Sequence, residues 1–254
     1  MNKAISGNEQ EVVYTKQLNR KDKFWDKINH DKNTTYAIHV ISKKYGKINE
    51  AKIQPKADII LAKGNIPLDY LSKNDFYLNE KDIKRFNLTL INESGISVKL
   101  PNSKYTITKI SPNTFIKIYG SNLLGAGASI YCNKEKDFSK NIEVLNGWSV
   151  QENDFYNYFN QKIKNLSINN LNDKEKLAQI KTFSNHQISK LTLNSKKISD
   201  LIFKGIGNFE EPYTAHYIIE NDEIKENYYI PFSITTGSGR SKGTFTIVFK
   251  PQSN

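Results

Sequence analysis

The chain has 254 residues, of which 37% are hydrophobic and 11% aromatic, and this composition is typical of a globular protein and excludes a disordered one. Its apolar runs are too short for a membrane-spanning helix, and the single cysteine, Cys132, excludes an intrachain disulfide and a cysteine-based zinc site. The net charge of +11 indicates a polyanionic partner such as nucleic acid, or else a coding bias toward lysine.

The first part of the chain is predicted to hold one helix followed by short strands. Residues 5–29 are predicted helical, because Ser6 and Glu9 form a capping box and Tyr14, Leu18, Trp25 and Ile28 then share one face. Residues 63–86 are predicted to be an insertion with a helical turn near 79–86. Residues 36–42 are predicted to be a strand or a short apolar element. Strands are predicted at 56–62, 86–92 and 95–100, the last two joined as a hairpin by a turn at 92–95.

The second part is predicted to be helical and then to return to strands. Residues 111–120 fit either a strand or a helix, and the glycine-rich segment 120–129 is predicted to be a flexible loop. Helices are predicted at 154–163, 173–183 and 195–207, and strands at 213–221, 227–234 and 243–251. This order predicts an α/β (α+β) fold, with a central mixed β-sheet flanked by helices. Because no linker interrupts the chain, we expect one domain over 1–254.

Familiar catalytic motifs are absent from the sequence. It contains no GxxxxGK[ST], GxSxG or HExxH, and no GxGxxG after a strand. The four histidines, His30, His39, His186 and His216, do not stand at metal-ligand spacing, so we expect surface or core histidines.

An acid and a lysine remain on two neighbouring predicted strands, Asp58 in "PKADIIL" and Lys99 in "GISVKLP". If these strands pair, a carboxylate and an ammonium group meet at one edge of a sheet. A carboxylate can recruit Mg²⁺ for phosphodiester hydrolysis, and a lysine can orient the attacking water. The alternative is a solvated strand face beside a turn aspartate.

The segments "PKAD" and "ISVKLPNSKY" resemble the PD-(D/E)xK nuclease signature, and more narrowly the small type II restriction endonucleases of the MspI-like kind. Gly7, Glu11, Tyr14 and Leu18 resemble that family's first helix, whose glutamate approaches the metal site, and "GSGRSKGTFTIVFKP" (237–251) resembles its C-terminal basic hairpin. The resemblance implies a restriction-endonuclease-like domain, with a catalytic core at 1–149 and helices and DNA-reading strands at 150–254.

The resemblance also implies roles for individual residues. Asp58 and the Val98 carbonyl would bind Mg²⁺, Lys99 would position the attacking water, and Glu11 would be an auxiliary acid. Ser97 stands where the usual second acid would be, and Glu93 or Glu50 could substitute for that acid. The separation of Asp58 and Lys99 is longer than usual, which the insertion at 63–86 would explain.

Basic and polar residues near the C-terminus and after the Lys99 strand are candidates for DNA binding. Ser238, Arg240 and Lys242 could read bases or clamp phosphates, and Asn102, Ser103 and Lys104 would contact the backbone. The expected function is Mg²⁺-dependent cleavage of double-stranded DNA at a short recognition sequence, by a bacterial cytoplasmic restriction enzyme with a partner methyltransferase. We expect no membrane association and a monomer or homodimer. Rival readings are a repair or junction nuclease, a non-catalytic DNA-binding protein on a nuclease scaffold, and an RNA-binding protein.

Overall fold

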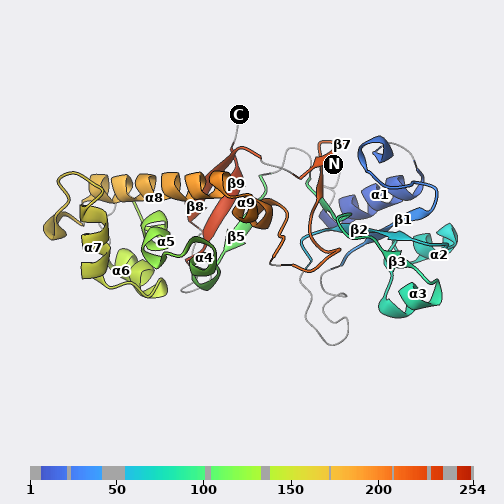
Figure 1. The fold of residues 1–254 in the computed structure, drawn as a ribbon, viewed down its shortest axis with the longest axis horizontal. Helices are drawn as coiled ribbons and strands as arrows, with labels where there is room; N and C mark the ends of the chain where they lie inside the picture. Colours follow the sequence, from blue (N-terminus) through green and yellow to red (C-terminus); the bar gives the residue numbers. More distant parts are fainter. Residues whose placement is uncertain are drawn as a thin grey trace, which may run out of the picture. The chain divides into compact units, whose positions relative to one another are not determined.

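A computed structural model describes residues 7–21, 24–41, 55–100, 104–132, 138–171, 173–207, 209–227, 230–236 and 245–252. Over these residues the chain is a mixed α/β protein with nine α-helices, a six-stranded mixed sheet and a three-stranded antiparallel sheet (Figure 1). No helix in these ranges has both the length and the apolar character needed to cross a membrane.

The chain divides into two compact units, each made of two separate stretches of sequence. Unit 1 comprises 1–103 and 200–230, and unit 2 comprises 104–199 and 231–254. This division differs from the expected boundary at residue 149, and the expectation of a single domain stays a prediction.

Unit 1 is built around the six-stranded sheet, whose order is β1-β2-β4-β6-β7 with β3 also paired to β2. Strands β4 and β6 are parallel, and the other pairs are antiparallel. The strands are β1 (Thr35–His39), β2 (Ile59–Lys63), β3 (Thr89–Leu90), β4 (Ile96–Val98), β6 (Tyr217–Glu220) and β7 (Glu223–Glu226).

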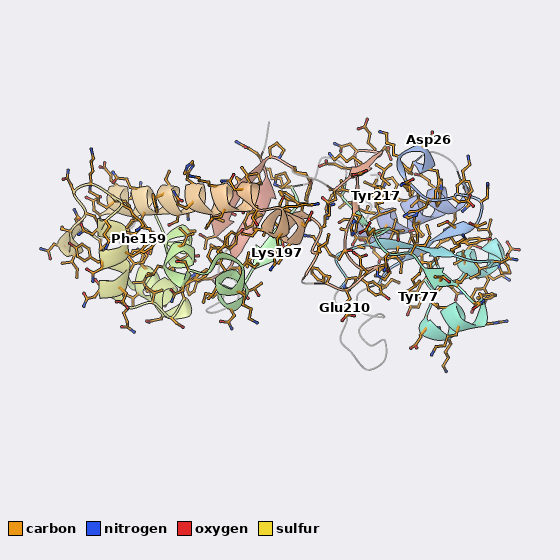
Figure 2. All side chains as sticks on the ribbon, viewed as in Figure 1. Asp26, Tyr77, Phe159, Lys197, Glu210 and Tyr217 are labelled. Atoms are coloured by element: carbon orange, nitrogen blue, oxygen red, sulfur yellow. The ribbon has the colours of Figure 1, made fainter. Side chains whose placement is uncertain are left out.

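Helices cover both faces of this sheet, as the sequence predicted. On one face, Tyr14 and Leu18 of α1 (Gly7–Asn19) pack with Ile59 and with Tyr217, which Figure 2 labels. On the other face, Ile60 packs with residues of and around two short helices. These helices are α2 (Leu68–Lys73) and α3 (Glu80–Arg85).

The predicted helix over 5–29 ends early. Helix α1 stops at Asn19, and a short 3₁₀ helix, η1 (Trp25–Lys27), follows. Phe24 between them has φ of 91°, which an α-helix cannot accommodate. The four predicted core residues are nevertheless all buried. The capping-box residue Ser6 lies outside the described residues.

The predicted hairpin between 86–92 and 95–100 is wrong. Strands β3 and β4 do not pair with each other, and both pair with β2. The side chain of Ser94 fills the gap between them, because its Oγ accepts a hydrogen bond from Leu61 N and donates one to Ile91 O. The segment between β3 and β4 therefore follows the edge of β2, so that both strands pair with β2 and not with each other.

Unit 2 combines helices with the three-stranded sheet β5-β9-β8. Residues 111–120 form a helix, because Ser111 caps its start, Pro112 occupies its first turn and Gly120 ends it in the left-handed region. The strands are β5 (Thr108–Ile110), β8 (Phe232–Thr236) and β9 (Ile247–Pro251). The helices are α4 (Pro112–Tyr119), α5 (Asn122–Ser129), α6 (Phe138–Gly147), α7 (Glu152–Asn160), η2 (Ile168–Asn170), α8 (Lys174–Asn194) and α9 (Lys196–Phe203, shared between the units).

The predicted flexible loop over 120–129 is a buried helix instead. In α5, a Cβ on Gly125 would lie 2.2 Å from Trp148, and one on Gly127 would lie 2.3 Å from Ser184 and 2.4 Å from Phe159. Phe159, labelled in Figure 2, is fully buried. The glycines of this segment therefore serve close helix packing and not flexibility.

Candidate active site

Asp58 and Lys99 meet in unit 1 where β2 begins and β4 ends. Asp58 immediately precedes β2 and Lys99 immediately follows β4, and the antiparallel pairing of Ile59 with Ile96 brings these two ends together. The backbone fixes both positions, because Asp58 N donates to Ile96 O at 2.9 Å and Lys99 N donates to Ile219 O at 2.8 Å. The parallel strand β6 thus holds the lysine in place.

A serine hydroxyl joins the two side chains. The Lys99 ammonium donates to Ser97 Oγ at 2.7 Å, and Ser97 Oγ donates to Asp58 Oδ2 at 3.1 Å. Val98 N also donates to Asp58 Oδ2, at 2.7 Å. Ser97 is buried, with 4% of its surface exposed. Ser97 therefore links the acid to the lysine.

The environment of Asp58 disfavours its ionised form. Burial raises the pKa of Asp58 from its ordinary 3.8 to about 6, and the Glu11 carboxylate contributes to that rise. The Lys99 ammonium and the hydrogen bonds from Val98 and Ser97 act in the opposite direction. The site therefore holds a carboxyl group whose charge is only partly compensated.

Glu11 approaches the site from helix α1 and is held by a buried histidine. Its Oε2 accepts a hydrogen bond from Nε2 of His39 at 2.9 Å, and the His39 side chain has no exposed surface. The sequence offered no signal that His39 pairs with this acid, because the two residues lie on different elements 28 positions apart.

A second lysine lies beside Lys99 and was missed as a site residue. The Lys56 ammonium donates to Ile202 O at 2.6 Å. Burial and, to a lesser extent, repulsion from Lys99 lower the pKa of Lys56 to about 7. Its place two residues before Asp58 in "PKAD" is the sequence signal that could identify it.

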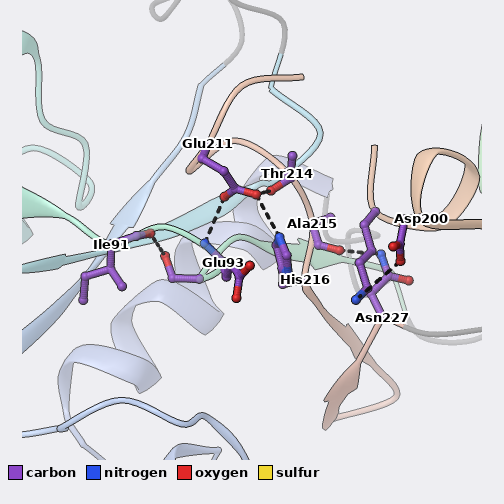
Figure 3. Close-up of polar contacts among 10 residues, drawn as sticks. Ile91, Glu93, Asp200, Glu211, Thr214, Ala215, His216 and Asn227 are labelled. Atoms are coloured by element: carbon purple, nitrogen blue, oxygen red, sulfur yellow. Dashed lines mark hydrogen bonds and ion pairs between the residues drawn. The ribbon is translucent and has the colours of Figure 1, made fainter. Parts of the chain in front are cut away.

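Polar contacts around Glu211 fix the start of β4 against the segment that leads into β6 (Figure 3). The Glu211 carboxylate accepts hydrogen bonds from the Thr214 hydroxyl, from His216 Nε2 at 2.9 Å and from Glu93 N at 2.9 Å. Since Lys99 ends the same strand, this network helps to set the register of the site.

The structure brings together five of the predicted site residues, Glu11, Asp58, Ser97, Val98 and Lys99. Val98 contacts Asp58 through its backbone N–H, and the role of its carbonyl as a metal ligand stays a prediction. Of the two candidate substitute acids, Glu93 is exposed in the turn before β4 and does not affect the pKa of Asp58, and Glu50 lies outside the described residues. Lys104 is exposed and belongs to unit 2. The other predicted DNA-binding residues lie outside the described residues: Asn102, Ser103, Ser238, Arg240 and Lys242.

The donors at this site fit a magnesium ion with few protein ligands. Within the described ranges no group of three or more histidine, cysteine or acidic side chains could hold a metal. Mg²⁺, however, commonly uses one or two carboxylates and keeps several waters. Both hydrogen bonds described for the Asp58 carboxylate go to Oδ2, so Oδ1 keeps lone pairs for a cation, and Glu11 supplies a second carboxylate nearby.

No family model, curated protein or solved structure matches the chain.

Proposed function

We propose that the chain is a Mg²⁺-dependent endonuclease that hydrolyses double-stranded DNA at a short recognition sequence, as a type II restriction enzyme does. The observation that carries this proposal is the hydrogen-bonded series Asp58–Ser97–Lys99 at the junction of β2 and β4, with Glu11 as a second carboxylate. The resemblance of "PKAD" and "ISVKLPNSKY" to the PD-(D/E)xK signature supports it, as does a mixed sheet between helices.

Asp58 and Glu11 are the residues that would hold Mg²⁺. When bound there, the ion would polarise a phosphoryl oxygen and lower the pKa of a bound water. The Glu11 carboxylate raises the pKa of Asp58, because the two negative charges repel each other. A divalent cation bound between them would offset this repulsion, so the pair favours cation binding.

Lys99 supplies a fixed positive charge beside Asp58. In this role it orients the attacking water and offsets the negative charge that develops on the phosphate. Ser97 fixes the position of the Lys99 ammonium group, because the Ser97 hydroxyl accepts a hydrogen bond from that group and donates one to the Asp58 carboxylate. Serine therefore acts here as a positioning residue and does not replace a metal-binding acid.

The proposal is tested by the cleavage rates of Asp58→Asn and Lys99→Met on supercoiled plasmid in Mg²⁺. Loss of a charged group that acts on the transition state costs about 100- to 1000-fold in rate, so both variants should lose cleavage by at least this factor. Lys84→Met is the control, because Lys84 is exposed on α3 and pairs with Glu80 on the same helix. Normal cutting by both site variants would show that this site assignment is wrong.

A non-catalytic DNA-binding protein on a nuclease scaffold is the second candidate. It is favoured by Ser97, which stands where the signature usually has an acid, and by the small number of acidic ligands among the described residues. Binding of DNA without Mg²⁺-dependent cleavage in the wild-type chain would select this candidate.

A further inference from the structure

The net positive charge of the chain belongs almost entirely to unit 2. Unit 2 has 17 lysines and arginines against 7 acidic residues, a net charge of +10, whereas unit 1 has 20 against 19, a net charge of +1. The two values account for the +11 of the whole chain. The asymmetry is hidden in the sequence, because each unit is assembled from two separate stretches.

A coding bias toward lysine does not explain this asymmetry. The two units have similar numbers of basic residues for their lengths, so such a bias would affect both alike. The difference comes from the acidic residues, which are scarce in unit 2. Within the described part of the chain, every ion pair between side chains joins residues of unit 1.

Two exposed lysines of unit 2 lie on its small sheet, and a third, Lys104, precedes it. Lys109 is on β5 and pairs with Val248 of β9, and Lys250 lies two residues further along β9. Side chains alternate along a strand and paired residues point to the same side, so Lys109 and Lys250 share one face. Lys104 is exposed and lies in the segment just before β5.

The opposite face of this sheet is the core of unit 2. Ile110, Ile247 and Phe249 are buried there. On the lysine face Ser233, the partner of Lys250, is exposed as well, and Val248 between the lysines is buried. The exposed part of this face is therefore polar and basic.

Protection of a sheet edge is the ordinary explanation for lysines on an outer strand. It accounts for Lys104 and Lys109, which lie on or beside the edge strand β5. It does not account for Lys250, because β9 is the central strand and both of its edges are already paired.

We infer that unit 2 is the DNA-binding unit and that Lys104, Lys109 and Lys250 contact the phosphates of duplex DNA. Duplex DNA carries one negative charge per about 1.7 Å of its axis, so several neighbouring lysines can each meet a phosphate. The choice of duplex DNA as the polyanion rests on the proposed endonuclease function. Unit 2 would then supply affinity, and the Asp58 site of unit 1 would supply the chemistry.

The test is the salt dependence of binding by the full-length Lys109→Gln/Lys250→Gln variant. Affinity for a fluorescent 30-base-pair duplex is measured by anisotropy between 50 and 200 mM salt in EDTA, which prevents cleavage. Each phosphate contact contributes about 0.9 to the slope of log K against log salt. In the Gln variant the slope should be smaller in magnitude by about 1.8, and the affinity for the duplex should fall tenfold or more. The Lys109→Arg/Lys250→Arg variant keeps both charges and should keep the wild-type slope.

The matched control removes two charges from unit 1. Lys73→Gln/Lys81→Gln replaces two exposed lysines of or beside α2 and α3 and should leave the slope unchanged. The inference is overturned if the two double variants lose equal slope, if neither loses any, or if the wild-type chain binds RNA more tightly than duplex DNA. Cleavage is scored separately: a chain that shows the predicted slope change but never cuts refutes only the proposed function, and one that cuts with an unchanged slope refutes only this inference.

Discussion

Replacing Asp58 by asparagine should stabilise the fold while it removes the chemistry. The Asp58 carboxyl group has a pKa of about 6 in the folded chain, against an ordinary value of 3.8. Each tenfold difference in proton affinity corresponds to 1.36 kcal/mol, so ionised Asp58 destabilises the fold by about 3 kcal/mol at neutral pH. This is an upper figure, because the side chain is only half-buried. Asparagine keeps an oxygen that can accept from Val98 N and Ser97 Oγ.

The advantage of Asp58→Asn should depend on pH in a defined direction. Below about pH 3 the carboxyl group is protonated in both states and adds no penalty. Between about pH 4 and pH 6 the unfolded chain ionises while the folded chain keeps its proton, so the stability of the wild type falls as pH rises. Above about pH 7 the full penalty is present, and the variant should exceed the wild type by about 3 kcal/mol more than it does below about pH 3.

Urea unfolding at pH 4.5, 5.5, 6.5 and 7.5 without divalent metal measures this difference. Mg²⁺ added at pH 7.5 should stabilise the wild type, by about 2.7 kcal/mol at 100 times its Kd, and should leave Asp58→Asn unchanged. Glu93→Gln is the control, because Glu93 is exposed and does not contribute to the pKa shift of Asp58. A difference between wild type and Asp58→Asn that is constant across this pH range would contradict the raised pKa of the Asp58 carboxyl group.

Three further predictions concern neighbouring residues. Lys99→Met removes the charge that lowers the pKa of Asp58, so that pKa should rise above 6 and the loss of stability should shift to higher pH in the same urea series. Glu11→Gln removes a charge that raises this pKa, so the loss should shift to lower pH, and an unchanged midpoint would contradict the proximity of the two acids. Gly95→Ala places a Cβ 1.9 Å from a backbone carbonyl oxygen before β6, so it should lower the free energy of unfolding by about 3 kcal/mol or more, measured by thermal unfolding. Gly120→Ala, which is strained only by its φ of +69°, is the control and should lower it by about 1 kcal/mol.

The pairing of Asp58 with Lys99 could be predicted because local signals define both strands. The apolar runs "IIL" and "ISV" set β2 and β4, and the polar residues stand at their ends. The antiparallel register then brings the acid and the lysine together, although 41 positions separate them in the chain. The structure is needed to tell which acid raises the pKa of Asp58: Glu11 raises it, and Glu93 does not.

The errors arose where long-range packing overrides local preference. Glycine is a poor helix former, so 120–129 was expected to be a loop, yet Gly125 and Gly127 allow Trp148 and Phe159 to pack against α5. The turn at 92–95 indicated a hairpin, but Ser94 bonds to β2 and places β3 and β4 in line. The two-unit division could not be read from the chain, because no linker marks it and each unit is discontinuous.

The measurement that most directly tests the central claim is a digest of a sequenced plasmid by the purified chain in Mg²⁺, with the fragment ends mapped. A site-specific endonuclease predicts discrete fragments whose ends share one short sequence, and no fragments in EDTA. An intact plasmid, or cleavage confined to branched DNA, would contradict the claim that this chain cuts duplex DNA at a recognition sequence.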